Sequence, residues 1–217
     1  MKIKSLLSSA VIVFSLSASA AIAADLKVKI TSSLASVDVM HNGKKITIMR
    51  NQDNKNEVNK AFAKTSRNCP PFCINPMQLA PGVETLGELE VLDFLKKMSD
   101  GDSSILVIDS RTPDWVKKGT IPGAVNIPWT KLSIKKGADP ITIADIVTGQ
   151  FNARELDDDK FDYSKAKTLV MFCNGMWCGQ SPNNIRSLLK MGYPANKIKW
   201  YRGGMQNWEN LGFTTAK

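Results

Sequence analysis

The 217-residue sequence contains only one histidine, His41, and only four cysteines. The cysteines form two close pairs, Cys69/Cys73 and Cys173/Cys178, whose spacings differ from the C-x2-C spacing of zinc knuckles. The single histidine lies far from both pairs along the chain. We therefore expect no metal site, and the sequence shows no binding motif for an organic cofactor.

Long apolar runs are also missing beyond the N-terminus. A short basic start is followed by small and apolar residues at 6–20 and then by Ala21-Ile22-Ala23, which a signal peptidase accepts. A membrane anchor is the rival interpretation, but the run is short for a bilayer and rich in Ser and Ala. We expect residues 1–23 to be a signal peptide. The mature protein should then be exported, soluble and free of the membrane, in a bacterial periplasm.

Acidic residues are fewer than basic ones, with 20 against 29, and the formal net charge is +9. Lys2 and Lys4 lie in the expected signal peptide, which leaves +7 for the mature chain. The lysines are scattered and form no stripe interleaved with aromatic residues, as a nucleic-acid surface would require. The charge therefore predicts a mild attraction for small anionic substrates and no nucleic-acid partner.

All four cysteines lie in the part expected to be exported, where disulfides can form. Four cysteines allow three pairings, and the sequence does not choose among them. For Cys69-Pro70-Pro71-Phe72-Cys73 the favoured interpretation is a small disulfide that rigidifies a connection. The alternative is that this pair lies near Cys173 and exchanges electrons or sulfur with its loop.

The mature chain divides near Pro81-Gly82 into an extension at residues 24–82 and a domain at residues 83–217. The extension is predicted to be β-rich because apolar and polar residues alternate along parts of it. We expect a strand at 26–30, a polar helix at 54–67 and a hairpin whose strands flank an Asn-Gly turn. His41, beside that turn, is expected to be an exposed turn residue.

In residues 83–217 the patterns of helices and strands alternate, which predicts an α/β layer fold with a largely parallel sheet. The expected strands lie at 105–108, 124–127, 169–172 and 198–201. Four helices are expected. The first begins at a capping box formed by Thr85 and Glu88 and places Leu89 on its inner face. Two others lie at 141–151 and 205–211, and a fourth is capped by Ser181.

The segment 169–181 carries the strongest chemical signal. Cys173 follows an apolar strand, and its loop leads directly into a helix N-terminus, where unpaired N–H groups favour negative charge. A thiolate in that position is stabilised, and Gly175 and Gly179 let the backbone turn its N–H groups toward one point. Such a cradle suits a thiolate, a persulfide or an oxyanion. A buried or disulfide-bonded structural cysteine is the alternative.

Residues 85–215 resemble the rhodanese family of sulfurtransferases. The likeness rests on four motifs that occur in the family's order: D-x-R after a strand at 109–111, T-I-P-G-A-V-N-I-P at 120–128, Phe172-Cys173 with its loop, and G-G-M-Q-N-W at 203–208. The resemblance implies the rhodanese-like three-layer fold with a largely parallel central sheet, preceded here by the β-rich extension.

The resemblance also implies a mechanism. Cys173 would take sulfane sulfur from a small donor, become a persulfide and pass the sulfur to a thiol or another thiophilic acceptor. Asp109 and Arg111 would brace the loops around the site. The substrate-binding loop would comprise Asn174, Gly175, Met176, Trp177, Gly179, Gln180 and Ser181.

Three departures from the family pattern keep alternatives open. Thr120 stands where histidine is usual, and the seven-residue loop between Cys173 and Ser181 lacks lysine and arginine, which weakens the case for thiosulfate. The loop also holds Cys178, a candidate resolving thiol. The alternatives are therefore a thiol–disulfide or persulfide redox protein, with a periplasmic redox protein as a candidate partner, and a non-catalytic binding module.

Overall fold

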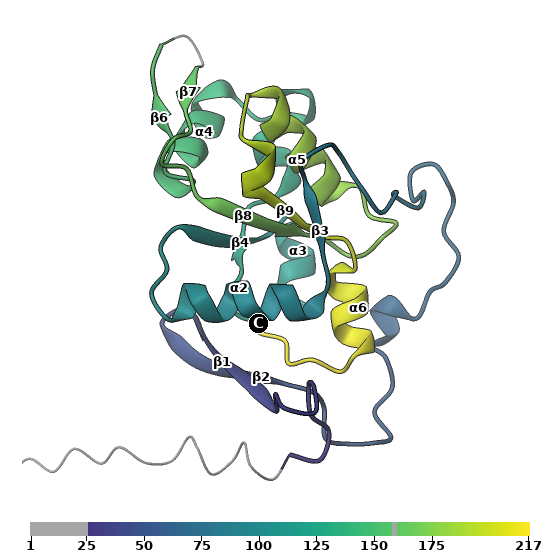
Figure 1. The fold of residues 1–217 in the computed structure, drawn as a ribbon. Coiled ribbons are helices and arrows are strands. Elements are labelled where there is room, and N and C mark those ends of the chain that lie inside the picture. Colours follow the sequence, from purple (N-terminus) through teal and green to yellow (C-terminus); the bar gives the residue numbers. More distant parts are fainter. Residues whose placement is uncertain (1–25, 158–159) are drawn as a thin grey trace, which may run out of the picture.

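The computed structural model describes residues 26–157 and 160–217, so the expected signal peptide lies outside the described residues. Helices and strands alternate through most of this part (Figure 1). The strands are β1 (Ser36–His41), β2 (Lys44–Met49), β3 (Glu84–Leu86), β4 (Ile105–Asp109), β5 (Val125–Asn126), β6 (Arg154–Glu155), β7 (Phe161–Asp162), β8 (Thr168–Phe172) and β9 (Ile198–Tyr201). The α-helices are α2 (Glu88–Ser99), α3 (Pro113–Val116), α4 (Pro140–Asp145), α5 (Gln180–Lys190) and α6 (Gly204–Asn210). Shorter turns are η1 (Lys60–Phe62), η2 (Trp129–Leu132), η3 (Ile134–Lys136), the π-helical η4 (Ile146–Gln150) and η5 (Ala195–Lys197).

The centre of the molecule is a five-stranded sheet in the order β3-β9-β8-β4-β5. Every neighbouring pair in it is parallel. Four of the five residues of β8 are buried, which is why that strand reads as a continuous apolar run. The expected α/β class and parallel sheet are therefore confirmed.

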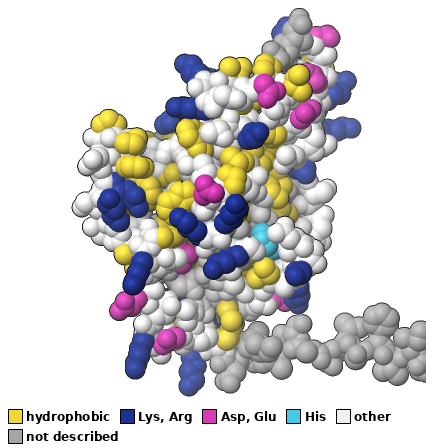
Figure 2. All heavy atoms as spheres, turned by 180° about the vertical axis from the view of Figure 1, so that it is seen from behind, with side chains coloured by type: hydrophobic (Ala, Val, Ile, Leu, Met, Phe, Trp, Pro, Cys, Tyr) yellow, Lys and Arg dark blue, Asp and Glu magenta, His cyan; other side chains and the backbone are white. Residues whose placement is uncertain are grey.

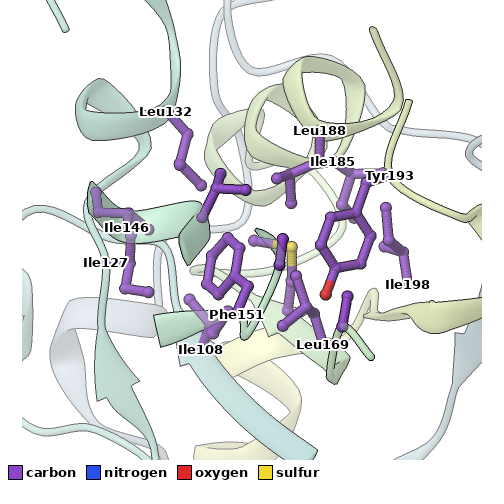
Figure 3. Packing of buried hydrophobic residues seen from close by; sticks show 14 of the residues in the cluster. Ile108, Ile127, Leu132, Ile146, Phe151, Leu169, Ile185, Leu188, Tyr193 and Ile198 are labelled. Atoms are coloured by element: carbon purple, nitrogen blue, oxygen red, sulfur yellow. The ribbon is translucent and has the colours of Figure 1, made fainter. Parts of the chain in front are cut away.

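A layer of helices covers each face of the sheet, and each face has its own hydrophobic core. One core packs α4, η4 and α5 against the sheet through residues such as Ile108, Phe151 and Leu188 (Figure 3). The other packs α2 and α6 against the opposite face through residues such as Leu92 and Trp208. The expected three-layer architecture is present (Figure 1).

The predicted hairpin is β1 paired with β2, and it lies on the outer side of α2 (Figure 1). Val39 and Ile48 from the hairpin are buried in the same core as α2. His41 corrects our expectation of an exposed turn residue. Its side chain is partly buried, and its Nδ1 accepts a hydrogen bond from the Gly123 amide at 3.1 Å.

Two predicted elements of the extension are wrong. No strand forms at 26–30, where Val28 instead bonds through both backbone groups to the side chain of Gln52. No helix forms at 54–67 beyond the three-residue turn η1. Side chains there bond to nearby backbone amides, as Asp53 does to Lys55, and such local bonds compete with helix formation.

The starts of two helices also differ from the sequence prediction. Thr85 lies in β3, and α2 begins at Glu88 with Glu90 accepting a bond from the Gly87 amide. Leu89, expected on the inner face, is 49% exposed. Ser181 is not the cap of α5 but lies in its first turn, which begins at Gln180. In both helices a glycine, Gly87 or Gly179, precedes the first turn, and glycine is also accepted at that position.

Lysine and arginine side chains are spread over the surface, as the face in Figure 2 shows. Within residues 26–157 and 160–217, no helix has the length and apolar character needed to cross a membrane.

Candidate functional site

Cys173 comes directly after β8, at the carboxyl edge of the sheet, and its side chain is 3% exposed. The strands on both sides of β8 end near the same edge, because β8 pairs in parallel with β4 and β9. Ligands of open parallel sheets bind beyond this edge. The fold therefore places the predicted nucleophile where such folds carry their chemistry.

Ser181 is a side-chain hydrogen-bond partner of the Cys173 sulfur. Its hydroxyl donates a hydrogen bond to Cys173 Sγ at 3.2 Å. The same oxygen accepts a bond from Trp200 Nε1 at 3.2 Å, so the hydroxyl proton is left to point at the sulfur. Burial alone would raise the pKa of Cys173, but hydrogen bonds from Cys178, from the Ser181 hydroxyl and from the Ser181 and Gly175 amides lower the pKa to about 7.

Cys178 is the second free thiol of the loop and is 4% exposed. Its carbonyl oxygen lies 3.5 Å from Cys173 Sγ, and its own thiol lies 3.6 Å from Gln180 Oε1. Burial and the neighbouring Cys173 sulfur raise the pKa of Cys178. The loop thus holds one thiol, Cys173, that ionises near neutral pH and one, Cys178, that stays protonated there.

The glycine that the loop geometry requires is Gly204 rather than either predicted glycine of the loop. Its φ is +55°, and a Cβ there would overlap the Cys173 carbonyl. This approach lets the amides of Met205 and Gln206, in the first turn of α6, bond to the carbonyls of Cys173 and Asn174 at 3.0 and 2.9 Å. The sequence signal for this contact was the pair Gly203-Gly204 at the start of α6, which we attributed to the family motif alone.

Gly175 and Gly179 differ in how closely their surroundings approach. A Cβ at Gly175 would meet the Gln206 side chain at 3.0 Å, whereas Gly179 faces open space and has an ordinary φ of −89°. The Gly175 amide helps to lower the Cys173 pKa, and its carbonyl accepts a bond from the Cys178 amide at 2.9 Å. Gly175 is therefore part of the cradle, while Gly179 only precedes α5.

Asp109 and Arg111 form a buried ion pair at 2.6 Å at the end of β4. Arg111 also donates to the Gly119 carbonyl, and the Thr120 hydroxyl donates to Asp109 at 2.7 Å. The Asn126 side chain donates to the backbone carbonyls of Asp109 and Arg111. These residues tie the loops after β4 together, and none of their hydrogen bonds within the described part of the chain reaches Cys173 or Cys178.

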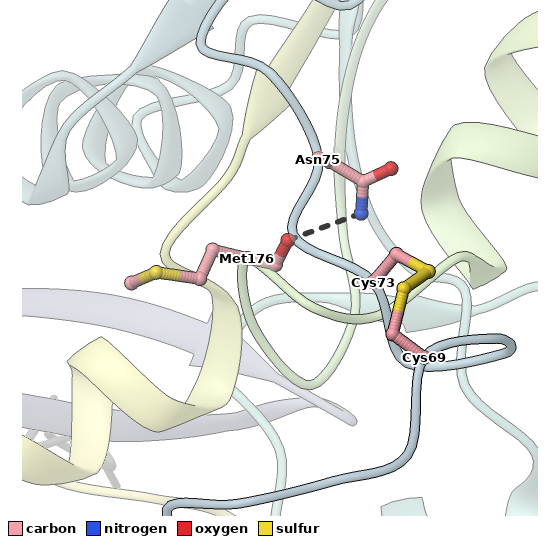
Figure 4. Close-up of a disulfide and its surroundings, with 4 residues drawn as sticks. All are labelled: Cys69, Cys73, Asn75 and Met176. Carbon is pink, nitrogen blue, oxygen red and sulfur yellow. Dashed lines mark hydrogen bonds between the residues drawn. A yellow bond between two sulfur atoms is a disulfide. The ribbon is translucent and has the colours of Figure 1, made fainter.

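The segment that contains Cys69 and Cys73 lies against the Cys173 loop. The two cysteines form a disulfide (Figure 4). Asn75 donates from its backbone and side chain to the Met176 carbonyl, and from its side chain to the Cys178 carbonyl at 3.1 Å. The proximity that the sequence could only suggest is therefore present.

A cavity of about 530 Å³ opens beside the loop. Its lining includes Asn174, Trp177, Cys178 and Gln180. Arg67 and Lys136 also line it and supply the positive charge that the loop itself lacks. Sequence analysis missed both, because each lies far from Cys173 along the chain and carries no motif. Among the described residues, no group of three or more His, Cys, Asp or Glu side chains could hold a metal ion.

The comparisons with known proteins point to one family. The family model described as a rhodanese-like domain matches residues 91–211, which is more than half of the chain. A search of curated protein sequences found no match.

Several solved structures are similar to part of the chain. One is a human single-domain sulfurtransferase, 19% identical, covering 59% of this chain and 96% of that chain, with a TM-score of 0.35. Another is a Rhodopseudomonas palustris protein of unknown function, described as a possible tyrosine phosphatase, at 19% identity, 64% and 88% coverage and a TM-score of 0.41. A third is a thiosulfate sulfurtransferase from Pseudomonas aeruginosa, at 19% identity, 62% and 20% coverage and a TM-score of 0.39.

Proposed function

The chain belongs to the rhodanese-like domain family, and on this basis we propose that it is a sulfurtransferase that carries sulfane sulfur on Cys173. The observation that carries the proposal is geometric: Cys173 follows β8 at the carboxyl edge of the sheet, and the Ser181 hydroxyl donates to the Cys173 thiol at 3.2 Å. The pKa of this thiol is lowered to about 7, so about half of it is the nucleophilic thiolate at neutral pH. Buried structural cysteines lack such a set of donors and stay protonated.

The reaction has two steps. With thiosulfate as donor, the Cys173 thiolate attacks the sulfane sulfur, the donor's S–S bond breaks and its electron pair leaves with sulfite. In the second step a thiolate acceptor attacks the outer sulfur of the Cys173 persulfide and removes it as an acceptor persulfide. Cys173 returns as a thiolate, so no external oxidant or reductant is needed.

The cradle around Cys173 would stabilise both the free thiolate and the persulfide that forms from it. The Ser181 hydroxyl and the amides of Gly175 and Ser181 stabilise negative charge on the sulfur. A persulfide extends the anionic sulfur by one atom, and donors aimed at a developing charge stabilise it before and after transfer. In this account the loop backbone, not a loop side-chain cation, holds the charge.

We place this activity in an oxidising compartment, as expected for an exported protein with a signal peptide at residues 1–23. The disulfide between Cys69 and Cys73 supports that placement, since disulfides persist outside the reducing cytosol. A bacterial periplasm is the compartment we propose.

A second candidate function is a dithiol–disulfide or persulfide redox cycle that uses Cys173 and Cys178 together. One observation favours it: both thiols are free in the same loop, one with a lowered pKa and one with a raised pKa. This division matches an attacking thiolate and a resolving thiol. In such a cycle the Cys178 thiolate would attack the inner sulfur of the Cys173 persulfide and break its S–S bond, and the outer sulfur would leave as hydrosulfide. An external dithiol protein would then reduce the Cys173–Cys178 disulfide.

A matched pair of variants separates these functions. The assay follows thiocyanate formation from thiosulfate and cyanide for the wild type, Cys173→Ser and Cys178→Ser. Sulfur transfer on Cys173 predicts that Cys173→Ser abolishes turnover and that Cys178→Ser retains it. A dithiol cycle predicts that both variants are inactive. Undiminished turnover by Cys173→Ser would refute the carrier role.

A further inference from the structure

The cavity beside the Cys173 loop has one wall from outside the family-matched region. Arg67, Pro71 and Phe72 belong to the N-terminal extension, whereas the family match covers residues 91–211. Other lining residues, Trp115, Trp129 and Lys136, lie inside that region. The extension therefore completes a cavity that the matched region alone leaves open.

This extra wall is fixed in place. The Cys69–Cys73 disulfide closes the short loop that carries Pro71 and Phe72 (Figure 4). The Phe72 ring meets the Trp177 ring edge-on at 5.8 Å, and the Arg67 guanidinium lies 4.0 Å from the centre of the Trp177 ring. Asn75, just beyond the disulfide, bonds to the loop backbone. A wall held by this many contacts is preorganised for a ligand.

The cavity combines aromatic surface with positive charge. Three tryptophans line it, and a cation lies over each ring: Lys118 over Trp115 at 4.7 Å, Lys136 over Trp129 at 5.3 Å and Arg67 over Trp177. The lining includes no Asp or Glu. Within the described part of the chain, no ion pair joins any of these three cations to a carboxylate.

Polar groups in the cavity are buried without partners. Among the described residues, Arg67 Nε, Trp129 Nε1 and Asn174 Oδ1 have no hydrogen-bond partner, and Asn174 is only 4% exposed. A buried donor without an acceptor costs free energy, so the Arg67 and Trp129 side chains would gain by turning these N–H groups toward an acceptor in the cavity.

The size of the cavity excludes a small inorganic ion as a good fit. Its volume of about 530 Å³ lies within the range of organic ligand sites. Thiosulfate would leave most of the aromatic surface in contact with water. We propose that the cavity binds an organic anion with a flat apolar body and an oxygen-bearing anionic group, and that this anion is the sulfur donor. The donor role rests on the proposed function, whereas the binding does not.

An aromatic thiosulfonate shows how such a donor would react. Its ring would lie among the tryptophans, and its sulfonyl oxygens would meet Arg67 and Trp129. Its terminal sulfur would point toward Asn174, the lining residue that directly follows the buried Cys173. The Cys173 thiolate attacks the terminal sulfur, the sulfur–sulfur bond breaks and its electron pair leaves with the aromatic sulfinate. The Cys173 persulfide forms with charge and atoms in balance.

Binding can be tested without sulfur transfer. Full-length Cys173→Ser is titrated by calorimetry with benzenesulfonate, with methanesulfonate, which lacks the ring, and with benzenesulfonamide, which lacks the charge. The three affinities give the contributions of the ring and of the charge to binding. We expect benzenesulfonate to bind at least about tenfold tighter than either of the others, the discrimination that one pocket group provides. Equal affinities for all three, or no saturable binding of benzenesulfonate, would overturn the proposal.

Variants identify the wall. In the same background, Arg67→Gln and Phe72→Ala should each weaken benzenesulfonate binding about tenfold, and Arg67→Lys should lose less because it keeps the charge. The matched control is Lys97→Gln, which removes a cation 5.8 Å from the Phe94 ring away from the cavity. If Arg67→Gln binds as tightly as Lys97→Gln, the extension does not form the site. Thermal unfolding of each variant shows that it is folded.

A donor comparison in the wild type separates the two proposals. Persulfide formation on Cys173 is followed by mass with benzenethiosulfonate, methanethiosulfonate and thiosulfate. The cavity proposal predicts that the aromatic donor has the highest kcat/KM, by at least about tenfold. If thiosulfate loads Cys173 as efficiently, the donor class is wrong while the sulfurtransferase proposal stands. If no donor loads Cys173 but benzenesulfonate binds, the sulfurtransferase proposal fails and the binding site stands.

Discussion

At the scale of single residues, the chemistry depends on a balance around Cys173. Burial favours the neutral thiol, while donors from Cys178, Ser181 and Gly175 favour the thiolate, and the donors prevail. The opposite holds for Cys178, whose pKa is raised by burial and by the adjacent Cys173 sulfur, so that its thiol stays protonated. Two thiols in one loop thus have pKa values shifted in opposite directions.

The pH dependence of Cys173 reactivity follows from this pKa. The thiolate is the reactive form, so alkylation of Cys173 should speed up as the pH rises through about 7 and level off above it. An unperturbed thiol would continue to gain reactivity up to about pH 8.5. Alkylation rates with iodoacetamide from pH 5 to 10, read on the Cys173 peptide, provide the midpoint. A midpoint near 9 would contradict the described cradle.

Ser181 is the side chain whose loss should shift this midpoint most cleanly. Ser181→Ala removes a hydrogen bond to the thiolate at 3.2 Å and leaves Trp200 Nε1 without an acceptor. We expect the Cys173 pKa to rise by about one to two units, since a hydrogen bond to a charged group contributes roughly 1.5–3 kcal/mol net of its exchange with water. Ser187→Ala, further along α5, is the control and should leave the midpoint where it is. An unshifted Ser181→Ala midpoint would remove this residue from the account.

Residue-scale prediction from sequence succeeded where the signal was local. Cys173 was identified because an apolar strand, a loop and a helix pattern follow one another directly in the chain. Arg67 and Lys136 were not, because their places in the cavity depend on contacts across many residues that no local pattern records. The role of Ser181 as a partner of the sulfur, rather than a helix cap, was missed for the same reason.

At the scale of elements, the start of α6 shapes the Cys173 loop from outside. Its first amides hold the carbonyls of Cys173 and Asn174, and only a glycine at position 204 lets the two backbones approach. The strands that the sequence predicted best are the buried central ones, because two covered faces demand a continuous apolar run. The predicted helix at 54–67 failed, since its polar side chains bond locally to the backbone.

A glycine substitution tests the contact between α6 and the loop. Gly204→Ala adds a Cβ at a positive φ and against the Cys173 carbonyl, so we expect a loss of at least about 1–3 kcal/mol in the free energy of unfolding. Cys173 should also alkylate more slowly at neutral pH because its loop is displaced. Gly149→Ala, which meets nothing within 4 Å, is the matched control and should change stability little. Equal unfolding midpoints in denaturant for the two variants would contradict this contact.

At the scale of the whole molecule, the extension is part of the same packed unit as the parallel sheet. Ile48 and Val39 from the hairpin are buried in the core that also contains α2 and α6. The extension also meets the C-terminal segment, where the Asn51 amide bonds to the Gly212 carbonyl at 2.6 Å and Thr214 bonds to Met49. The sequence indicated the hairpin but not what it packs against, because long-range packing leaves no periodic signal.

A pair of isoleucine substitutions tests this cooperativity. Ile48→Ala should destabilise the protein by about 2–5 kcal/mol, because Ile48 is fully buried. Unfolding should remain a single transition when followed by tryptophan fluorescence and circular dichroism. Ile134→Ala, at a side chain that is 66% exposed, should stay within about 0.5 kcal/mol of the wild type. A separate early transition in Ile48→Ala would show that the extension unfolds independently.

The central claim is that Cys173 carries sulfane sulfur, and the mass of the loaded protein tests it most directly. The protein is gently reduced, freed of reductant and exposed to thiosulfate or benzenethiosulfonate, and its intact mass and peptides are then measured. The account predicts a gain of one sulfur atom on the Cys173 peptide that fresh reductant reverses, which distinguishes a persulfide from irreversible oxidation. Loss of two hydrogens with a link between Cys173 and Cys178, and no sulfur gained from either donor, would contradict it.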